Sequence, residues 1–401
     1  MKNLGMVRRA GRSGWLGWLG WSGWWLGAVV LGMVLPVYGQ YGGGTGEPNN
    51  PYQIWDPNQM NAIGADPNNW GKHFKLMANI DMDPDVTGIP AYTTALIAPD
   101  TVSNYYTFEG IPFTGTFDGN GYKISNFTID ATGTGNDYLG LFGYIGSGSI
   151  VKNLGLETCN ITGGSNIEDT GVLCGRNDGN IIRCNTTGTI SVFSGLSLGG
   201  LCSVNTGSIT QSYSTVTITC KYSNSFHIGG LCGSNAGNIS YCFATGDVTC
   251  GYYSGTIGGL CGNNSSKIND CYAMGNVTSG SNSSYLGGLC GRNGDGTGIS
   301  YNISNCYSTG KVISGDDSDH IGGLCGYGFV NNCYWDMETS GIGSGLGYGL
   351  TTLQMQDPNT FLEAGWDFIE ETANGTSNIW FISTGTYPQL YCFSDNFTSY
   401  Q

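Results

Sequence analysis

Hydrophobic residues in this chain occur in short clusters, and the same order of clusters returns along residues 141–335. In one unit the clusters are "IGGLCG", "KINDCYAM" and "NVTSG", each bounded by Gly, Asn or Ser. None of them has the ten or so residues with apolar positions at i, i+3 and i+4 that a helical repeat shows. The pattern therefore predicts three short β-strands and three turns in each unit.

The units share one leucine, which defines their spacing. It stands at Leu141, Leu173, Leu201, Leu231, Leu260, Leu289 and Leu324, so the steps are 32, 28, 30, 29, 29 and 35 residues. A leucine-rich horseshoe has a different leucine spacing, and a propeller blade needs four strands in about forty residues. The sequence therefore predicts an all-β fold, a parallel β-solenoid of seven coils of 28–35 residues.

The segments on either side of the repeats differ from them. We expect an N-terminal capping segment with the first strands over 40–130, the repeat solenoid over 131–335 and a C-terminal cap over 336–401. Asp56 followed by Pro57 predicts the start of a short helix, and "TTLQMQDPNTFLEAG" predicts a second one. "FDGNGYKI" predicts a strand, a turn and the next strand.

Residues 1–39 precede the fold. Lys2, Arg8, Arg9 and Arg12 stand before the apolar, Trp-rich run "WLGWLGWSGWWLGAVVLGMVLP". This order is typical of a secretory signal peptide, although the run is also about long enough to anchor the chain in a bilayer. No later segment is long and apolar enough to span a membrane, so we expect no membrane contact beyond the signal segment.

These residues resemble a known family. The cores "GLFG", four copies of "GLCG", and the variants "VLCG" and "GLCS" are similar to the GLUG motif of bacterial secreted and surface proteins. "FTGTFDGNGYKISNFTI" resembles the segment that precedes such repeats, and "YWDMETSG" to "IWFISTGTYPQLY" resembles the one that follows, so the resemblance extends from Pro51 to Tyr391. It implies a right-handed β-helix on an extracellular protein, and no activity is attached to the repeat itself.

Composition agrees with a strand-and-turn fold and limits the partners. The chain has 69 glycines, only 11% charged residues and a formal net charge of −15. Removing the four positive charges of the signal segment makes the exported part more acidic still. We therefore expect no nucleic-acid partner, because binding phosphates requires a basic face.

The cysteines fall into columns with the period of the repeat. One column holds Cys174, Cys202, Cys232, Cys261, Cys290 and Cys325, and another holds Cys184, Cys242, Cys271, Cys306 and Cys333, with Ser212 and Asn153 in the places without cysteine. A metal site usually shows a CxxC pair, which is absent here. We expect mostly buried thiol ladders with some disulfides, and Cys220 with Cys250 as the disulfide candidate.

No catalytic or cofactor-binding constellation is recognisable. The three histidines are His73, His227 and His320, and no nucleophile elbow, HExxH or phosphate loop is present. Carboxylates could gather on one face after folding, with Asp247, Asp270 and Asp316 as candidates. Two acidic runs are weak calcium candidates; they contain Asp81, Asp83 and Asp85, and Asp316, Asp317 and Asp319.

The sequence thus predicts a secreted or cell-surface β-helix protein with a structural or adhesive role and no catalytic activity. Extracellular proteins or glycans are the expected partners, and self-association stays open. The alternative is a carbohydrate-active enzyme, a lyase or hydrolase, that uses carboxylates on one face of the β-helix. Two or three carboxylates close together in a groove would favour the enzyme.

Overall fold

The computed structural model describes residues 39–88, 90–102, 107–294, 303–383 and 385–394. Contacts divide the chain into two compact units, Met1–Tyr38 and Gly39–Gln401. The first unit, which holds nearly all of the predicted signal segment, lies outside the described residues. In the part of the chain that is described, no helix has both the length and the apolar character needed to cross a membrane.

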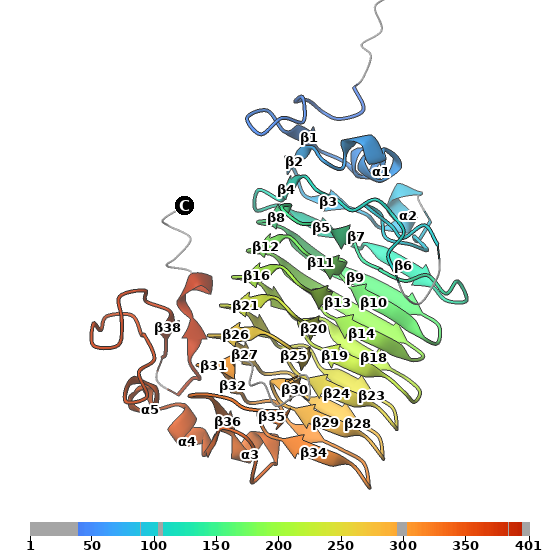
Figure 1. The fold of residues 1–401 in the computed structure, drawn as a ribbon. Coiled ribbons are helices and arrows are strands. Elements are labelled where there is room, and N and C mark those ends of the chain that lie inside the picture. The colour runs from blue at the N-terminus through green and yellow to red at the C-terminus, as the bar shows by residue number, and fades with distance from the viewer. Residues whose placement is uncertain (1–38, 89, 103–106, 295–302, 384, 395–401) are drawn as a thin grey trace, which may run out of the picture. The chain divides into compact units, whose positions relative to one another are not determined.

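The described chain winds into stacked coils whose strands pair in parallel, so the predicted all-β solenoid is confirmed (Figure 1). One coil contains β24 (Gly255–Gly258), β25 (Cys261–Asn264), β26 (Lys267–Asn269), β27 (Tyr272–Ala273) and β28 (Val277–Ser279). The prediction of three strands per unit is wrong, because tight corners divide two of the three apolar clusters and give five strands. Asp270, for example, turns the chain between β26 and β27 with a φ of 52°.

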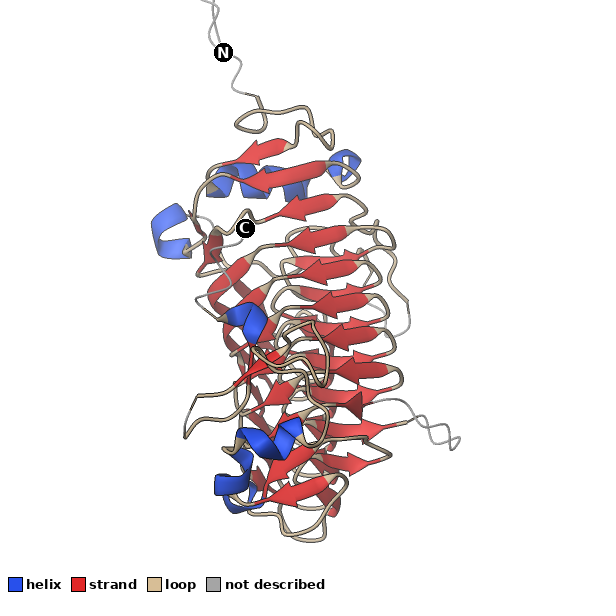
Figure 2. Cartoon of the chain, turned by 90° about the vertical axis from the view of Figure 1, so that its left-hand side faces the viewer, coloured by secondary structure: helices blue, strands red, loops and turns tan. Residues whose placement is uncertain are grey.

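Equivalent strands of successive coils form four long sheets, which Figure 2 shows as a ladder of arrows. The nine-stranded sheet holds β1 (Tyr52–Ile54), β2 (His73–Leu76), β4 (Thr116–Asp118), β8 (Ile150–Lys152), β12 (Asn180–Ile182), β16 (Ser208–Thr210), β21 (Asn238–Ser240), β26 and β31 (Ile303–Ser304). The seven-stranded sheet holds β7 (Phe142–Ile145), β11 (Cys174–Asn177), β15 (Cys202–Asn205), β20 (Cys232–Asn235), β25, β30 (Cys290–Asn293) and β35 (Cys325–Tyr327).

The other two long sheets complete each coil. The six-stranded sheet holds β10 (Ile167–Gly171), β14 (Gly195–Gly199), β19 (Phe226–Gly229), β24, β29 (Ser284–Gly287) and β34 (Asp319–Gly322). The fifteen-stranded sheet holds β3 (Ile80–Asp81), β5 (Lys123–Ser125), β6 (Thr128–Ala131), β9 (Gly155–Gly163), β13 (Asn185–Val192), β17 (Tyr213–Ser214), β18 (Thr217–Cys220), β22 (Phe243–Ala244), β23 (Val248–Cys250), β27, β28, β32 (Tyr307–Ser308), β33 (Val312–Ile313), β36 (Tyr334–Asp336) and β37 (Tyr348–Leu350). A separate antiparallel pair joins β38 (Trp380–Phe381) to β39 (Gln389–Leu390).

The corner between the nine-stranded and fifteen-stranded sheets repeats in every coil. Its residues have left-handed backbone conformations, with φ between 49° and 55°, at Asn153, Arg183, Gln211, Tyr241, Asp270, Asn305 and Asn332. Left-handed φ is costly for most side chains and cheaper for Asn and Asp. A solenoid corner that must turn sharply therefore explains why these two residue types are frequent here.

Asparagines also form a ladder inside the coils. Asn177, Asn205, Asn235, Asn264 and Asn293 pair in register in the seven-stranded sheet. The Nδ2 of each asparagine donates to the Oδ1 of the next, at 2.7 or 2.8 Å. All five are buried, so the ladder satisfies polar groups that would otherwise be costly in the core.

Helices are short and lie outside the repeats. α1 (Pro57–Ala65) begins as predicted, because the side chain of Asp56 accepts from Gln59 N. The others are η1 (Pro67–Asn69), α2 (Pro84–Thr87), α3 (Met337–Ser340), α4 (Thr352–Met355), α5 (Pro358–Leu362) and η2 (Tyr391–Phe393). The one helix predicted over 351–365 is thus two. "FDGNGYKI" does give two strands, but β4 and β5 belong to different sheets, so its turn is a solenoid corner.

The segment after β37 does not simply cover the end of the stack. Figure 1 shows it, in red, running back beside the coils. Its aromatic residues form a second hydrophobic cluster with Tyr272, Tyr307 and Tyr334 of the fifteen-stranded sheet. The flank of the solenoid is therefore partly covered by the chain itself.

Candidate functional site

A single column of side chains runs along this flank, on the fifteen-stranded sheet. In register order it contains Lys123, Gly155, Asn185, Tyr213, Phe243, Tyr272, Tyr307, Tyr334 and Tyr348, and we call it the flank column. Tyr213, Phe243 and Tyr272 are stacked, with ring centroids 4.6 and 4.8 Å apart. The parallel register produces this stacking, because equivalent residues lie one strand spacing apart.

The C-terminal segment packs on the middle of the flank column, whereas Tyr348 at its far end is 62% exposed. Phe393 meets Phe243 edge-on at 5.0 Å and Tyr213 at 5.5 Å. Trp380 lies 6.1 Å from the ring of Tyr307, whose hydroxyl donates to the carbonyl of Pro388 at 2.5 Å. The covered aromatic rings therefore stabilise the fold, and the free part of the column begins beyond Tyr213.

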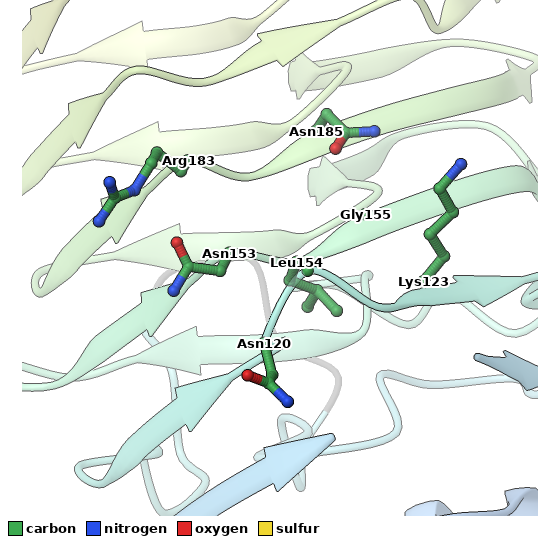
Figure 3. Close-up of a pocket in the computed structure, with 8 residues that line it drawn as sticks. Asn120, Lys123, Asn153, Leu154, Gly155, Arg183 and Asn185 are labelled. Atoms are coloured by element: carbon green, nitrogen blue, oxygen red, sulfur yellow. The ribbon is translucent and has the colours of Figure 1, made fainter. Parts of the chain in front are cut away.

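The free part opens into a hollow of ≈ 360 Å³ that we call the open end. Its lining residues are Asn120, Gly121, Lys123, Asn153, Leu154, Gly155, Arg183 and Asn185, and Figure 3 shows them on successive coils. Gly155 leaves a gap in the column between Lys123 and Asn185. A Cβ at Gly155 would lie 3.2 Å from Lys123 Cγ and 3.4 Å from Asn185 Oδ1, so a side chain there would narrow the hollow.

The charges at the open end are only partly neutralised. Lys123 Nζ lies 2.6 Å from Glu157 Oε1, and this hydrogen bond raises the pKa of Lys123. Asn153 Nδ2 donates to Asp118 Oδ1 at 3.0 Å. Among the described residues, the exposed side chain of Arg183 has no ion pair or hydrogen bond, and the amide of Asn185 has no hydrogen bond.

This arrangement can bind a ligand by hydrogen bonds and charge. Three asparagine amides supply both donors and acceptors, while Arg183 supplies a planar cation that suits an anionic or hydroxyl-bearing group. The lining contains no carboxylate or histidine. The groups that line the open end are therefore amides and cations, with the carboxylates of Glu157 and Asp118 beside them.

The carboxylates suggested by the sequence lie at three different turns. Asp247 Oδ1 accepts from Asn276 N of the next coil at 2.8 Å. Asp270 is at the corner beside the C-terminal segment, where burial raises its pKa to about 6. Asp316 is exposed in the turn between β33 and β34. The structure does not bring these three together.

A different carboxyl cluster was missed by the sequence analysis. Asp137, Glu168 and Asp169 lie near the first strand of the six-stranded sheet, where Glu168 N donates to Asp137 Oδ1 at 3.2 Å. Burial raises the pKa of Asp137 to about 6 and that of Asp169 to about 7, and repulsion from Glu168 raises both further. Asp137 and Glu168 are 31 residues apart, which is one coil. The repeat period was the signal that could have found them.

The acidic runs proposed for calcium form hydrogen-bonded turns. Asp81 Oδ1 accepts from Asp83 N at 3.0 Å and from Asn126 Nδ2 at 2.9 Å. Asp83 caps α2 by accepting from Asp85 N, and Asp319 lies 3.2 Å from His320 Nδ1. Across the described ranges, no group of three or more His, Cys, Asp or Glu side chains is arranged to hold a metal ion. Calcium binding stays a prediction.

The cysteines stack in the core. Cys174, Cys202, Cys232, Cys261, Cys290 and Cys325 pair in register, with Phe142 in the preceding coil. Leu154, not Asn153, occupies the place before Cys184, because Gly155 pairs with Asn185. Cys220 and Cys250 also pair in register. All fifteen thiols are free in the structure, so a Cys220–Cys250 bridge stays a prediction.

The described chain is a β-solenoid whose repeats are similar to the GLUG motif. The GLUG motif matches residues 224–249 and 282–313, which confirms the resemblance noted in the sequence. A crystal structure from Bacteroides ovatus, named for an immunoglobulin A1 protease, has a similar fold with a TM-score of 0.52. That similarity covers 88% of this chain and 96% of the other at 18% identity. At this identity the likeness concerns the fold alone.

Two relatives resemble part of the chain. Halomucin of Haloquadratum walsbyi is 30% identical over 148 residues, which is 37% of this chain and 2% of halomucin. A protein of Evansella cellulosilytica, named a Gly-rich membrane protein, is 35% identical over 147 residues, which is 35% of this chain and 15% of that protein. The chain thus spans a small fraction of the length of both relatives.

Proposed function

We propose that this chain is a secreted or cell-surface β-solenoid with a structural and adhesive role, and that it binds an extracellular ligand at the open end of the flank column. The carrying observation is the change of character along that column. Its middle part, from Phe243 to Tyr334, packs against the chain's own C-terminal segment, whereas the part formed by Lys123, Gly155 and Asn185 borders a polar hollow that this segment does not line.

The chemistry of the open end favours a glycan over a protein surface. Protein interfaces usually bury aromatic and aliphatic anchors at their centre, and the open end instead presents three asparagine amides, Lys123 and Arg183. Side-chain amides and a guanidinium fit the hydroxyl and carboxylate groups of an extended saccharide. The neighbouring corner adds further amide and hydroxyl groups on successive coils, so a longer chain could follow the groove.

Location at the cell surface rests on two supports. The basic and apolar order of the first 39 residues is typical of export, and the matched relatives include a protein named as a membrane protein. A repeat scaffold is well suited to this place, since its stacked coils present a long, rigid face.

A glycan array tests the proposed function. We expect the full chain to bind a defined set of glycans, and the double variant Arg183→Gln/Asn185→Leu to lose at least about tenfold in affinity, since one charged and one neutral hydrogen bond are removed. Lys267→Gln, on an exposed strand outside the open end, is the matched control. Unchanged binding by the double variant, or an equal loss in the control, contradicts the proposal.

A carbohydrate-active enzyme is the second candidate, and the carboxyl cluster of Asp137, Glu168 and Asp169 is the observation that favours it. A protonated and an ionised carboxyl group on one face are the minimum for acid–base cleavage of a glycosidic bond. Assays of reducing-end release from a panel of polysaccharides should then show activity that Asp169→Asn abolishes. Activity that persists in Asp169→Asn would rule this cluster out.

A further inference from the structure

A second cluster lies where the six-stranded and seven-stranded sheets meet in the last coils. One position of the six-stranded sheet has a left-handed backbone conformation in four successive coils. It is occupied by His227, Thr256, Tyr285 and His320, and the residues that follow them pair in register. In the seven-stranded sheet, Ser234, Asn263, Arg292 and Tyr327 pair in register. Repetition thus brings four large polar side chains together, which we call the Arg292 cluster: Tyr285, Arg292, His320 and Tyr327.

The rings of the cluster hold the guanidinium in place. The Arg292 guanidinium carbon is 5.6 Å from the ring centroid of Tyr285 and 5.8 Å from that of Tyr327. Tyr285 stacks on His320 at 4.7 Å and meets Tyr327 edge-on at 5.7 Å. Contacts of this kind reduce the freedom of the arginine, so its charge has a fixed position before any ligand arrives.

This charge has no counter-ion among the described residues, and the same column contains a direct comparison. Arg176 stands 5.1 Å from the ring of Tyr144, but its Nε also lies 3.0 Å from Asp178 Oδ1. In the later coil "GRND" has become "GRNG", so Gly294 stands where Asp178 does. Among the described residues, Arg292 therefore keeps the aromatic support of Arg176 without its carboxylate; Asp295, which follows Gly294, lies outside the described residues.

The hydrogen-bonding capacity of the cluster is also unused. Arg292 Nε and Asn263 Oδ1, from residues that pair in register, are buried atoms without a hydrogen-bond partner in the described part of the chain. Tyr327 is 41% exposed and His320 is exposed too. The Arg292 guanidinium is thus a positioned cation beside exposed rings, on a chain with a net charge of −15. Such a group can bind an anion from solution.

We propose that the Arg292 cluster is a second binding site, for the carboxylate of an acidic saccharide. The guanidinium can donate to a carboxylate through its terminal nitrogens, whereas its Nε is buried and stays out of reach of an external ligand. The exposed aromatic faces of Tyr327 and His320 can pack against the apolar face of a sugar ring, as aromatic residues do in ligand sites. An acidic peptide supplies the same anion without the ring to pack, so the saccharide is the better fit.

The test measures binding of the full chain to immobilised polygalacturonate, with dextran as the neutral polysaccharide and polyglutamate as the acidic peptide. We expect Arg292→Gln to lose at least about tenfold in affinity for polygalacturonate, and Tyr327→Leu to lose less. Arg176→Gln, the matched control in the same column, should stay within about twofold. Far-UV circular dichroism of each variant verifies that it is folded, and Arg292→Lys, which keeps the charge but loses the planar fork, provides a milder second variant.

Each other outcome overturns the assignment. If wild type and Arg292→Gln bind polygalacturonate with equal affinity, the Arg292 cluster is not a binding site. If Arg176→Gln loses as much affinity as Arg292→Gln, the effect is one of positive charge in general. Binding of polyglutamate as tight as that of polygalacturonate assigns the site to acidic peptides, and equally tight binding of dextran shows that the carboxylate is not what the site recognises. Arg183→Gln reports on the open end alone, so the proposed function and this site can fail separately.

Discussion

Asn235 is the middle residue of the buried asparagine ladder. It shows how the same side-chain hydrogen bond, repeated between successive coils, forms a continuous ladder through the core. Its Nδ2 donates to Asn264 Oδ1 at 2.8 Å, and its Oδ1 accepts from Asn205 Nδ2 at 2.7 Å. It also accepts from Gly237 N, one corner further along its own coil. Because every rung supports the next one, removal of a single side chain leaves polar partners unsatisfied in two other coils.

Asn235→Ala is expected to lower the free energy of unfolding by about 3 kcal/mol, because buried donors and acceptors are left without partners. Denaturant unfolding followed by circular dichroism measures the change. Asn263→Ala is the control, since Asn263 Oδ1 already lacks a partner, and its effect should stay within about 0.5 kcal/mol. An equal effect of the two variants would show that the ladder contributes nothing specific.

The raised pKa of Asp169 predicts an unusual dependence of the free energy of unfolding on pH. Its folded pKa of about 7 lies above the usual value, so between pH 4 and 7 the folded state holds more protons than the unfolded state. Stability must then fall as pH rises through this window, by up to about 1.4 kcal/mol per pH unit for one such group. Asp169→Asn should reduce this slope in thermal melts at pH 4 to 7, and the part that stays is due to Asp137 and Asp270, whose pKa values are raised to about 6.

Asp178 gives the opposite sign and serves as the control. Its pKa lies below the usual value, with hydrogen bonds from Arg176, Thr206 and Tyr144 outweighing the effect of burial. Asp178→Asn should therefore cost stability above the unfolded pKa and leave the slope due to Asp169 in place. A slope that is the same in wild type and Asp169→Asn would refute the role given to Asp169.

At the scale of elements, the C-terminal segment is held by aromatic packing on the flank. Trp380 is fully buried against Tyr272, Tyr307 and Trp366. It stands in β38, which belongs to a two-stranded pair and not to the coil sheets. The attachment of this segment therefore depends on side chains more than on backbone pairing.

Trp380→Ala should release the C-terminal segment while the coils stay folded, at a cost of about 3–5 kcal/mol to the attachment. Limited proteolysis with mass spectrometry should find new cleavage sites after residue 340 and few before it. Leu353→Ala, which changes a side chain that is 80% exposed, should leave the digestion pattern unchanged. Cleavage throughout the coils of Trp380→Ala would mean that the segment supports the whole fold.

The elements also show what the sequence could and could not predict. The leucine period predicted the stacked coils, and Asp56 with Pro57 predicted the start of α1, because both depend on local spacing. The corner at Asp270 and the split of 351–365 into α4 and α5 were not predictable, since tight corners interrupt apolar clusters without changing their composition. The flank column was missed because aromatic residues are common in any strand. Their alignment, two places after the corner in several coils, is visible only when the coils are stacked in the structure.

At the scale of the whole molecule, the stacked coils hold fourteen of the fifteen thiols of a chain that we expect to be exported. Parallel, in-register cysteines keep their side chains parallel, and this orientation opposes the geometry of a relaxed disulfide. Burial also raises the pKa of Cys159 and of Cys184 to about 12, so the thiolate form of these two is scarce. The architecture itself therefore protects its cysteines.

Thiol counting tests this protection. Under denaturing, non-reducing conditions we expect thirteen to fifteen of the fifteen thiols to react, with Cys220 and Cys250 as the only predicted bridge. In the native state Cys392, which is half-buried while the other fourteen are buried, should react first with an alkylating reagent. Six or seven disulfides would contradict the thiol ladders.

We propose that the flank column is covered by the C-terminal segment from Phe243 to Tyr334 and binds a ligand at the open end. Hydrogen–deuterium exchange of the full chain, with and without the array glycan that binds most tightly, tests it directly. We predict that the glycan protects peptides containing residues 120–123, 153–155 and 183–185 and leaves those of 366–393 unchanged. Protection confined to other faces, or faster exchange in 366–393 without protection at the open end, would contradict it.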